Sequence, residues 1–333
     1  MSELVSESSA GSELVSESLA GSELVSESSA GSELVSETGL SLTAGEQSMT
    51  INGGNVVYEI LGDTGQLIAL TPGGRFSKDI PGLRPLAEAL VEGGYRVLLW
   101  DRPNCGKSDV QFYGQSESHM RAETLYKLVT ALGEGPCIIL GGSGGARDSM
   151  LTTMLYPEIV RKLVVWNIVG GVYGSFVLGG HYVTPSILAV RGLGIEGLLS
   201  VPEWRERIEQ NPANRRRLLD LDVDEFLKVM LRWLNAFVPK PGQTIPGVPD
   251  EMFDNITVPT LIIRGGENDW DHPKRTSLEV HCLIKGSALI EPPWPEDAWE
   301  RAGERFAQSG GKTFCLFDTW VQAAPAILDF LGK

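Results

Sequence analysis

The stretch that decides the fold is residues 137–145, CIILGGSGG, which precede the run ARDSMLTTMLY. Its first residues are apolar, as in a buried strand, and the run after Gly145 has the composition of a helix. Ser143 lies between two glycine pairs at this predicted strand-to-helix turn. The pattern Gly-x-Ser-x-Gly in this context is typical of a nucleophile elbow, a sharp turn that exposes a serine hydroxyl. The alternative is a glycine-rich turn or phosphate loop, but the Lys-Ser/Thr ending and the GxGxxG spacing are both missing.

The order of predicted elements around this turn indicates the fold class. From Met49 onward, apolar strand-like runs alternate with helix-like runs, and fully apolar strands separated by helices are typical of a parallel sheet covered on both faces. The sequence therefore predicts an α/β fold with a mostly parallel central sheet flanked by helices. The predicted strands lie within residues 56–61, 66–72, 95–101, 137–142, 162–171, 260–266 and 287–293.

One interval, residues 172–254, interrupts this alternation. It is rich in Leu, Trp and Arg, its longer runs have helical composition, and it ends in PKPGQTIPGVP. A helical insertion into a parallel sheet is the expected form of a lid, which supplies walls for a substrate pocket and excludes water. We therefore expect residues 49–171 and 255–333 to form the core of the fold and residues 172–254 to form a helical lid.

Residues 1–48 differ from the rest of the chain in composition. The decapeptide SELVSESSAG recurs about four times over residues 2–38, and the first 48 residues contain nine Glu and neither Lys nor Arg. Two apolar residues in ten cannot offset the entropy of ordering the segment, and a period of ten does not fit a coiled coil. We expect residues 1–48 to be a disordered acidic tail. That Met49 is the natural start is a hypothesis, which N-terminal sequencing of the native protein tests.

Composition excludes several classes of partner. Without the nine charges of the tail, the formal net charge of −15 becomes −6, whereas nucleic-acid-binding proteins need basic stripes. No apolar run is long enough to span a membrane, and no secretory signal is visible. Four widely spaced cysteines without a C-x-x-C pair favour reduced thiols in a cytoplasmic protein. No metal motif, nucleotide loop or flavin fingerprint is present, so no cofactor is predicted.

Residues 69–109, together with the GGSGG turn, resemble the α/β-hydrolase fold superfamily of the lid-bearing, serine-nucleophile type, and the resemblance extends from Met49 to Lys333. It implies that Pro72-Gly73-Gly74 is the oxyanion loop, with the backbone N–H groups of Gly74 and Gly144 as the two donors to a developing oxyanion. It also implies that Ser143 is the nucleophile. Asp101, Gly106 and Ser108 match a turn of the family that we interpret as scaffold.

The segment TLIIRGGENDWDHP, residues 260–273, resembles the strand and following loop that carry the family's catalytic acid. The resemblance implies that Asp269 is the acid that orients a histidine. An alternative is that Asp269 is a turn or helix-capping residue, since aspartate is favoured just before a helix. Glu267 and Asp271 are close enough to be mistaken for the acid.

The family's histidine, which usually lies shortly before the last helix, is not found. Residues 312–331, KTFCLFDTWVQAAPAILDFL, contain no histidine, and Asp318 lies near the expected place. A carboxylate such as Asp318 is a weak base toward an alcohol unless burial raises its pKa. The remaining candidate for the base is His181, at the start of the predicted lid. We interpret the other three histidines as a turn residue, a packed or surface residue and an exposed residue, respectively His272, His281 and His119.

These observations predict a serine-type hydrolase of an ester, lactone or C–C bond in a small hydrophobic substrate. Several tryptophans in the lid and in the loops after strands suit an aromatic or apolar molecule. Because the histidine is not found, two alternatives remain open: a cofactor-free lyase with the same fold, and a catalytically impaired protein that only binds a ligand.

Overall fold

The computed structural model describes residues 34–35 and 41–332. The repeats at residues 1–33 and residues 36–40 lie outside this range, so the prediction that the tail is disordered is not tested there. Within the described residues, no helix is both long enough and apolar enough to cross a membrane.

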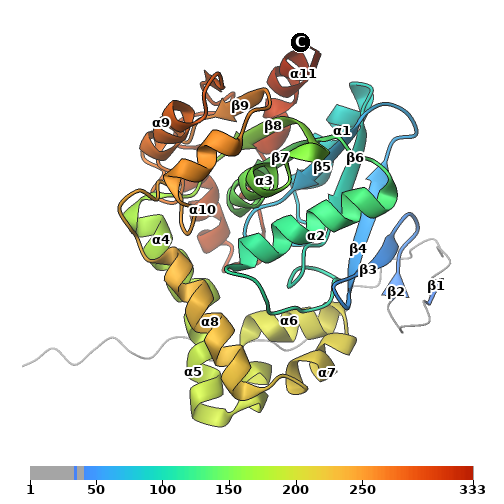
Figure 1. The fold of residues 1–333 in the computed structure, drawn as a ribbon, viewed down its shortest axis with the longest axis vertical. Helices are drawn as coiled ribbons and strands as arrows, with labels where there is room; N and C mark the ends of the chain where they lie inside the picture. Colours follow the sequence, from blue (N-terminus) through green and yellow to red (C-terminus); the bar gives the residue numbers. More distant parts are fainter. Residues whose placement is uncertain (1–33, 36–40, 333) are drawn as a thin grey trace, which may run out of the picture. The chain divides into compact units, whose positions relative to one another are not determined.

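The core of the fold is an eight-stranded sheet in the order β10-β9-β8-β7-β5-β6-β4-β3 (Figure 1). Only β4 pairs antiparallel, with β3 and with β6, and all other pairs are parallel. The prediction of a mostly parallel sheet in an α/β-hydrolase fold is therefore confirmed. The strands are β3 (Gln47–Ile51), β4 (Gly54–Leu61), β5 (Leu67–Thr71), β6 (Arg96–Trp100), β7 (Cys137–Gly142), β8 (Val160–Trp166), β9 (Thr260–Ile263) and β10 (Ala288–Ile290).

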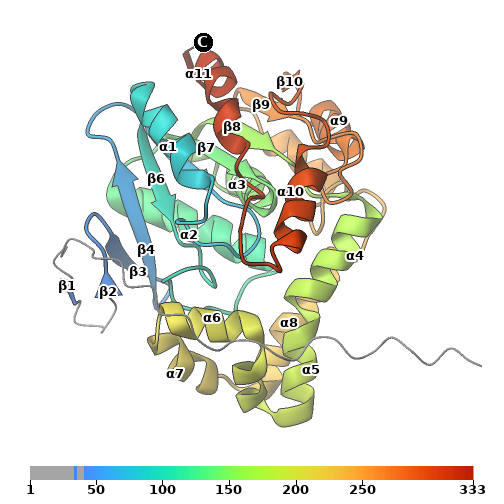
Figure 2. The same cartoon turned by 180° about the vertical axis from the view of Figure 1, so that it is seen from behind.

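Both faces of this sheet are buried. Along β5, Leu67 and Ala69 belong to one hydrophobic cluster and Ile68 and Leu70 to another, since successive side chains of a strand point to opposite faces. Apolar residues of α2 (Glu117–Leu132), α3 (Gly144–Leu155) and α9 (Lys274–Leu283) cover the first face. Those of α1 (Leu83–Glu92), α10 (Ala298–Gln308) and α11 (Ala324–Gly332) cover the second, which Figure 2 shows from the front. The strands are therefore apolar along their whole length because helices pack on both faces of the sheet.

Between β8 and β9 the chain forms a group of helices with a core of its own (Figure 1). Trp204, Phe226, Met230 and Trp233 are buried in this core, and Val110 of the sheet-bearing part packs against them. The helical character expected for residues 172–254 agrees with these elements. The helices are α4 (Gly171–Tyr182), α5 (Thr184–Leu193), α6 (Pro202–Gln210), α7 (Ala213–Leu219) and α8 (Val223–Phe237), followed by a 3-10 turn at Asp250–Asn255.

The fold begins before the predicted boundary at residue 48. Strand β3 starts at Gln47, and the Glu46 side chain, only 2% exposed, pairs with Lys78 at 2.6 Å and with Lys107 at 2.7 Å. The assignment of Glu46 to a disordered tail is therefore wrong. The physical reason is that the buried ammonium group of Lys78 needs carboxylate partners, which the sequence does not reveal. Burial by itself would raise the pKa of Glu46, but hydrogen bonds from Lys107 and Lys78 lower it to about 2.

Replacing Glu46 with Gln should reduce stability in a pH-dependent way. Because the pKa of Glu46 is depressed in the folded state, its ionised form stabilises the fold above its unfolded pKa near 4.5 and ceases to do so as the pH falls toward 2. We expect Glu46→Gln to lower the free energy of unfolding by about 1–2 kcal/mol at pH 7, a value that allows for partial screening by solvent. Urea denaturation at several pH values measures it.

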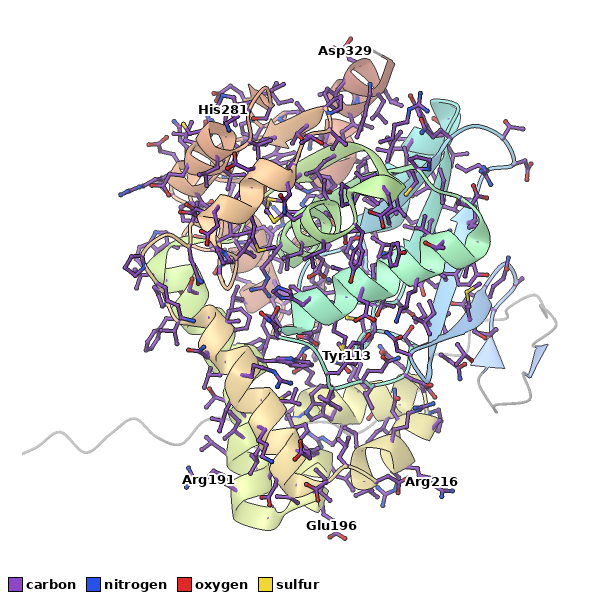
Figure 3. All side chains as sticks on the ribbon, viewed as in Figure 1. Tyr113, Arg191, Glu196, Arg216, His281 and Asp329 are labelled. Atoms are coloured by element: carbon purple, nitrogen blue, oxygen red, sulfur yellow. The ribbon has the colours of Figure 1, made fainter. Side chains whose placement is uncertain are left out.

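The matched control is Glu196→Gln on the exposed end of the helical insertion, which Figure 3 labels. It should leave the free energy of unfolding nearly unchanged. A deficit of Glu46→Gln that stays constant from pH 7 down to pH 3 would contradict the ion-pair account.

Candidate active site

Ser143 has a strained backbone at the end of β7. Its φ is 56° and its ψ is −126°, a combination that residues other than glycine rarely adopt. The turn is held from both sides, because Ser143 N–H donates to Trp166 O at 3.1 Å and Ala146 N–H donates to Ser143 O at 3.0 Å. Helix α3 begins at the next residue, Gly144. The half-buried Ser143 thus lies at the carboxyl edge of the parallel sheet and lines a cavity.

The glycines around Ser143 allow the backbone to pass this closely. A Cβ atom at Gly141 would overlap the Gly145 carbonyl, and one at Gly145 would overlap the carbonyl oxygen of Thr71 in β5. At Gly142 a Cβ atom would overlap the indole of Trp166. The composition of the GGSGG stretch is therefore a steric requirement of the turn.

The imidazole beside Ser143 belongs to His272. Its Nε2 lies 2.8 Å from Ser143 Oγ, and its Nδ1 lies 2.9 Å from Asp269 Oδ2. Since a carboxylate only accepts hydrogen bonds, Nδ1 carries the proton and Nε2 can accept the hydroxyl proton of Ser143. A hydroxyl, an imidazole and a carboxylate connected in this order can generate an activated oxygen nucleophile.

One short turn supplies both His272 and Asp269. Asp269 Oδ1 accepts from the backbone N–H of Asp271 at 3.1 Å and of His272 at 2.9 Å, which closes the loop and brings the side chain of residue i+3 back to the acid. Both side chains are almost fully buried, at 1% exposure each. The interpretation of His272 as a turn residue was therefore incomplete, because it is a turn residue that also contacts Ser143.

The residues expected to replace the missing histidine do not reach Ser143. His181 is exposed at the end of α4, and its ring contacts Tyr182. Asp318 is exposed, whereas its neighbour Phe317 is buried and stacks on Trp320 with ring centroids 3.8 Å apart. The prediction of His181 or Asp318 as the base is corrected by the position of His272, which is hydrogen-bonded to the hydroxyl.

The other two histidines are also engaged elsewhere. His119 lies inside α2, where its Nδ1 is 2.8 Å from Ser116 Oγ, so it is half-buried rather than exposed. His281 of α9 is 2.8 Å from Ser287 Oγ and lies at the outside of the molecule (Figure 3).

The loop at residues 72–74 lies against the start of α3. A Cβ atom built on Gly144 would be 3.0 Å from the backbone nitrogen of Gly74, so the two predicted N–H donors are neighbours. Gly144 is the first residue of α3, where backbone N–H groups have no partner within the helix. The buried guanidinium of Arg102 fixes the loop by donating to Gly73 O at 2.9 Å, and Asp148 holds Arg102 at 3.0 Å. The arrangement can therefore place two N–H groups beside the serine oxygen.

The segment after β10 covers the imidazole. The indole of Trp299 meets the His272 ring edge-on at 4.4 Å and donates to Asp271 Oδ2 at 3.2 Å. Next to it, both carboxyl oxygens of Glu300 are buried and have no hydrogen-bond partner among the described residues. Burial, followed by the nearby Asp269 charge, raises the pKa of Glu300. The long connection over residues 291–311 thus shields the histidine from one side.

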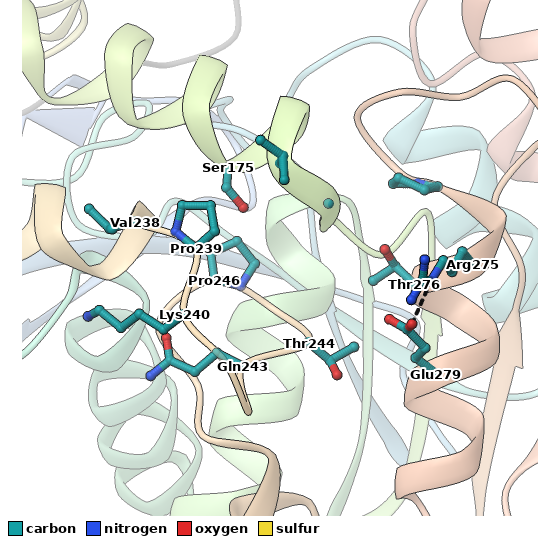
Figure 4. A pocket seen from close by; sticks show the side chains of 13 residues that line it. Ser175, Val238, Pro239, Lys240, Gln243, Thr244, Pro246, Arg275, Thr276 and Glu279 are labelled. Carbon is teal, nitrogen blue, oxygen red and sulfur yellow. Dashed lines mark hydrogen bonds and ion pairs between the residues drawn. The ribbon is translucent and has the colours of Figure 1, made fainter.

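A small cavity of about 30 Å³ adjoins Ser143. The helical insertion contributes Leu178, Tyr182 and Phe237 to its lining, and the oxyanion loop contributes Gly74. A larger cavity of about 350 Å³ lies between α4, α9 and the loop after α8, where Lys240, Gln243 and Thr276 face it (Figure 4), but Ser143 does not line it. The cavity at Ser143 is therefore the candidate site, despite its small volume.

No candidate metal centre accompanies the site. Within the described part of the chain, no group of three or more His, Cys, Asp or Glu side chains is arranged to hold an ion. The four cysteines are free thiols, and three of them are buried.

Comparison with known proteins agrees with this arrangement. A model of the alpha/beta hydrolase family matches residues 68–303. A 2-hydroxy-6-oxononadienedioate/2-hydroxy-6-oxononatrienedioate hydrolase of Klebsiella pneumoniae is 31% identical over 207 residues, which are 61% of this chain and 70% of that protein. The solved enol-lactonase of Burkholderia xenovorans is 17% identical, with a TM-score of 0.54 over 86% of this chain and 100% of that chain. A solved meta-cleavage product hydrolase, CumD, is 22% identical, with a TM-score of 0.53 over 86% and 97%. At these identities the two structures establish the fold alone.

Replacing Gly145 with Ala should destabilise the protein strongly. The added methyl group overlaps the carbonyl of Thr71 in a central strand, which cannot yield. We expect a loss of about 1–3 kcal/mol in the free energy of unfolding, or failure to fold. Urea denaturation followed by circular dichroism measures it.

Gly303→Ala in α10 is the matched control, because a Cβ atom there meets nothing within 4 Å. Alanine favours a helix interior, so this change should stabilise the protein by about 0.5–1 kcal/mol. Equal changes in the free energy of unfolding for Gly145→Ala and Gly303→Ala would contradict the close packing at the turn.

Proposed function

The chain belongs to the alpha/beta hydrolase family, and we propose that it hydrolyses a carbonyl compound with Ser143 as the nucleophile, His272 as the general base and Asp269 as the acid that orients the histidine. The observation that carries the proposal is the continuous pair of hydrogen bonds from Ser143 through His272 to Asp269, each 2.9 Å or shorter.

The proposed reaction proceeds in two halves. His272 Nε2 takes the hydroxyl proton as Ser143 Oγ attacks the carbonyl carbon, and the carbonyl oxygen becomes an oxyanion that accepts from the N–H groups of Gly74 and Gly144. The imidazolium then gives its proton to the leaving group, and an acyl-enzyme remains. Water repeats the sequence, with His272 again as the base, and releases the acid. The positive end of the α3 dipole favours the negative charge that develops in both halves.

The names of the relatives support a substrate with a reactive carbonyl group. The compound in the Klebsiella name carries a ketone and no ester, so its hydrolysis breaks a C–C bond, and the Burkholderia protein is named for an enol-lactone. We infer that this chain acts on a small molecule with a C–C or lactone bond next to a carbonyl, or on an ester. Val169, Leu178 and Phe237 supply an apolar wall. The charged residues of the lining are Arg75, Glu117, Arg121 and Arg147.

We also infer that residues 172–254 act as a lid. Helices α4 and α8 line the cavity, and the buried Arg75 of the oxyanion loop pairs with Glu203 of α6 at 2.6 Å. The cavity at Ser143 is narrow, and a shift of these helices would widen it for a substrate.

The geometry of the site favours hydrolysis over the two alternatives that the sequence left open. A lyase or an inactive ligand-binding protein was considered because an imidazole was not found near the serine. The hydrogen bond between His272 and Ser143 supports hydrolysis over both. Four free cysteines support the proposal that the protein works in the reducing cytoplasm.

Ser143→Ala and His272→Ala should each abolish most hydrolysis. With 4-nitrophenyl acetate as substrate, we expect kcat to fall by about 10³-fold or more for each, because the nucleophile and its base act as one unit. For the same reason, the double variant should be hardly slower than either single variant. Release of 4-nitrophenolate measures the rate.

The matched control is His281→Ala, which removes a histidine at the outside of the molecule and should leave kcat unchanged. His181→Ala tests the base expected from sequence. A large loss with His181→Ala and none with His272→Ala would refute the assignment.

A further inference from the structure

Arg147 lies one helical turn beyond the nucleophile. It is the fourth residue after Ser143, so the two residues lie on the same side of α3. Both line the small cavity, together with Gly74 and Gly144. Its neighbour Asp148 does not neutralise it, because Asp148 is buried and binds Arg102.

Arg147 has no ion-pair partner within the described part of the chain. Its Nε donates to Ser118 Oγ at 2.9 Å, and its guanidinium carbon lies 4.7 Å from the centre of the Phe237 ring. These contacts engage one edge and one face of the guanidinium. The two terminal Nη groups have no hydrogen-bond acceptor among the described residues. They are the ends of the side chain that bind a carboxylate with two parallel hydrogen bonds.

The other two arginines that line the cavity are neutralised. Arg75 pairs with Glu117 at 3.0 Å and with Glu203 at 2.6 Å, and Arg121 pairs with Glu117 at 3.1 Å. Burial would raise the pKa of Glu117, but Arg121 and Arg75 lower it to about 2, so it is ionised at neutral pH. Two glutamates therefore balance two arginines, and the charge of Arg147 remains uncompensated.

Even a half-buried cation is costly when it lacks a counter-charge, and a carboxylate on a ligand would supply that charge. Burial lowers the pKa of Arg147; Asp148 opposes this shift, and Arg121 adds to it. An arginine side chain nevertheless stays protonated in proteins. The site is thus one negative charge short of balance, at a point one helical turn from the reacting oxygen.

We propose that the substrate carries a carboxylate that binds the Nη groups of Arg147 while its carbonyl group lies at Ser143. The inference rests on the proposed function and adds to it the charge of the substrate. Because Arg147 and Ser143 line one small cavity, the carboxylate and the reacting carbonyl belong to the same short acyl chain, whose carbon atoms pack on Val169, Leu178 and Phe237. The expected small hydrophobic substrate is thereby specified further, as an acid with an apolar chain.

The test compares matched substrates that differ only in this charge. The substrates are the mono-4-nitrophenyl esters of succinate, glutarate and adipate. Each is paired with the 4-nitrophenyl methyl diester of the same acid, in which the free carboxylate is methylated. The rate without enzyme is subtracted from every measured rate. For wild-type protein, we expect the ratio of kcat/KM for acid to that for methyl ester to exceed 1 for at least one chain length. In Arg147→Met this ratio should fall by about 30-fold or more, and Arg147→Lys should retain part of it because it keeps the charge.

Arg216→Met is the control, since Arg216 is 88% exposed on the helical insertion, where Figure 3 labels it, and does not line the cavity at Ser143. It should leave the ratio unchanged. A wild-type ratio at or below 1 for all three chain lengths would overturn the proposal, and so would an unaltered ratio in Arg147→Met. If Arg147→Met does not fold, the proposal is tested by the kcat/KM ratio of acid to methyl ester in the wild-type protein and by the same ratio in Arg147→Lys, which should retain only part of it.

A second measurement separates this inference from the proposed function. Calorimetric titration of the Ser143→Ala protein with monomethyl glutarate, dimethyl glutarate and inorganic phosphate requires no turnover. The carboxylate site is supported if only the monomethyl ester binds and if this binding is lost in the double variant Ser143→Ala/Arg147→Met. This result would stand even if no nitrophenyl ester were hydrolysed, in which case only the proposed function fails. Equal binding of both glutarate esters, or binding of phosphate alone, overturns the proposal of a carboxylate site at Arg147.

Discussion

The turn at Ser143 holds the backbone at a φ of 56°, which costs about 1–3 kcal/mol for a residue with a side chain. The strands and α3 supply this energy, because Trp166 and Ala146 fix the two peptide groups of Ser143 and the flanking glycines let β5, β7 and α3 approach closely. If the turn relaxed, the hydroxyl would leave the carboxyl edge of the sheet, and the N–H groups of Gly74 and Gly144 would no longer lie beside it. The geometry of the whole site depends on this constraint.

The proposed acid, Asp269, and the proposed base, His272, come from a single loop, which makes their mutual geometry a local property. Hydrogen bonds from the backbone of residues 271 and 272 to Asp269 close the turn, and the same carboxylate binds the imidazole. Trp299 then covers the ring from the segment after β10. With His272 as the proposed base, the chain needs no histidine before the last helix. Buried Phe317 and Trp320 lie in that region instead.

Much of the fold and most of the candidate site could be predicted from sequence, because they depend on local pattern. The alternation of apolar strands with helices indicated the sheet, and the glycine-flanked turn indicated Ser143. The resemblance to the α/β-hydrolase fold indicated the loop at Gly74 and the position after β9 where Asp269 lies. His272 was missed because its role is a contact across 129 residues, which no periodicity encodes; the D-x-x-H spacing beside a predicted acid was the available signal. Glu46 was misjudged for a related reason, since sequence does not show which charges become buried.

The central claim is that Ser143, His272 and the two backbone N–H groups form one site. A crystal structure of the protein inhibited by a phosphonate ester tests it most directly. We predict a covalent bond to Ser143 Oγ, a phosphonyl oxygen within 3.1 Å of the nitrogens of Gly74 and Gly144, and His272 Nε2 within hydrogen-bond distance of an oxygen on phosphorus. A phosphonate on another residue, or a phosphonyl oxygen pointing away from Gly74 and Gly144, would contradict the account.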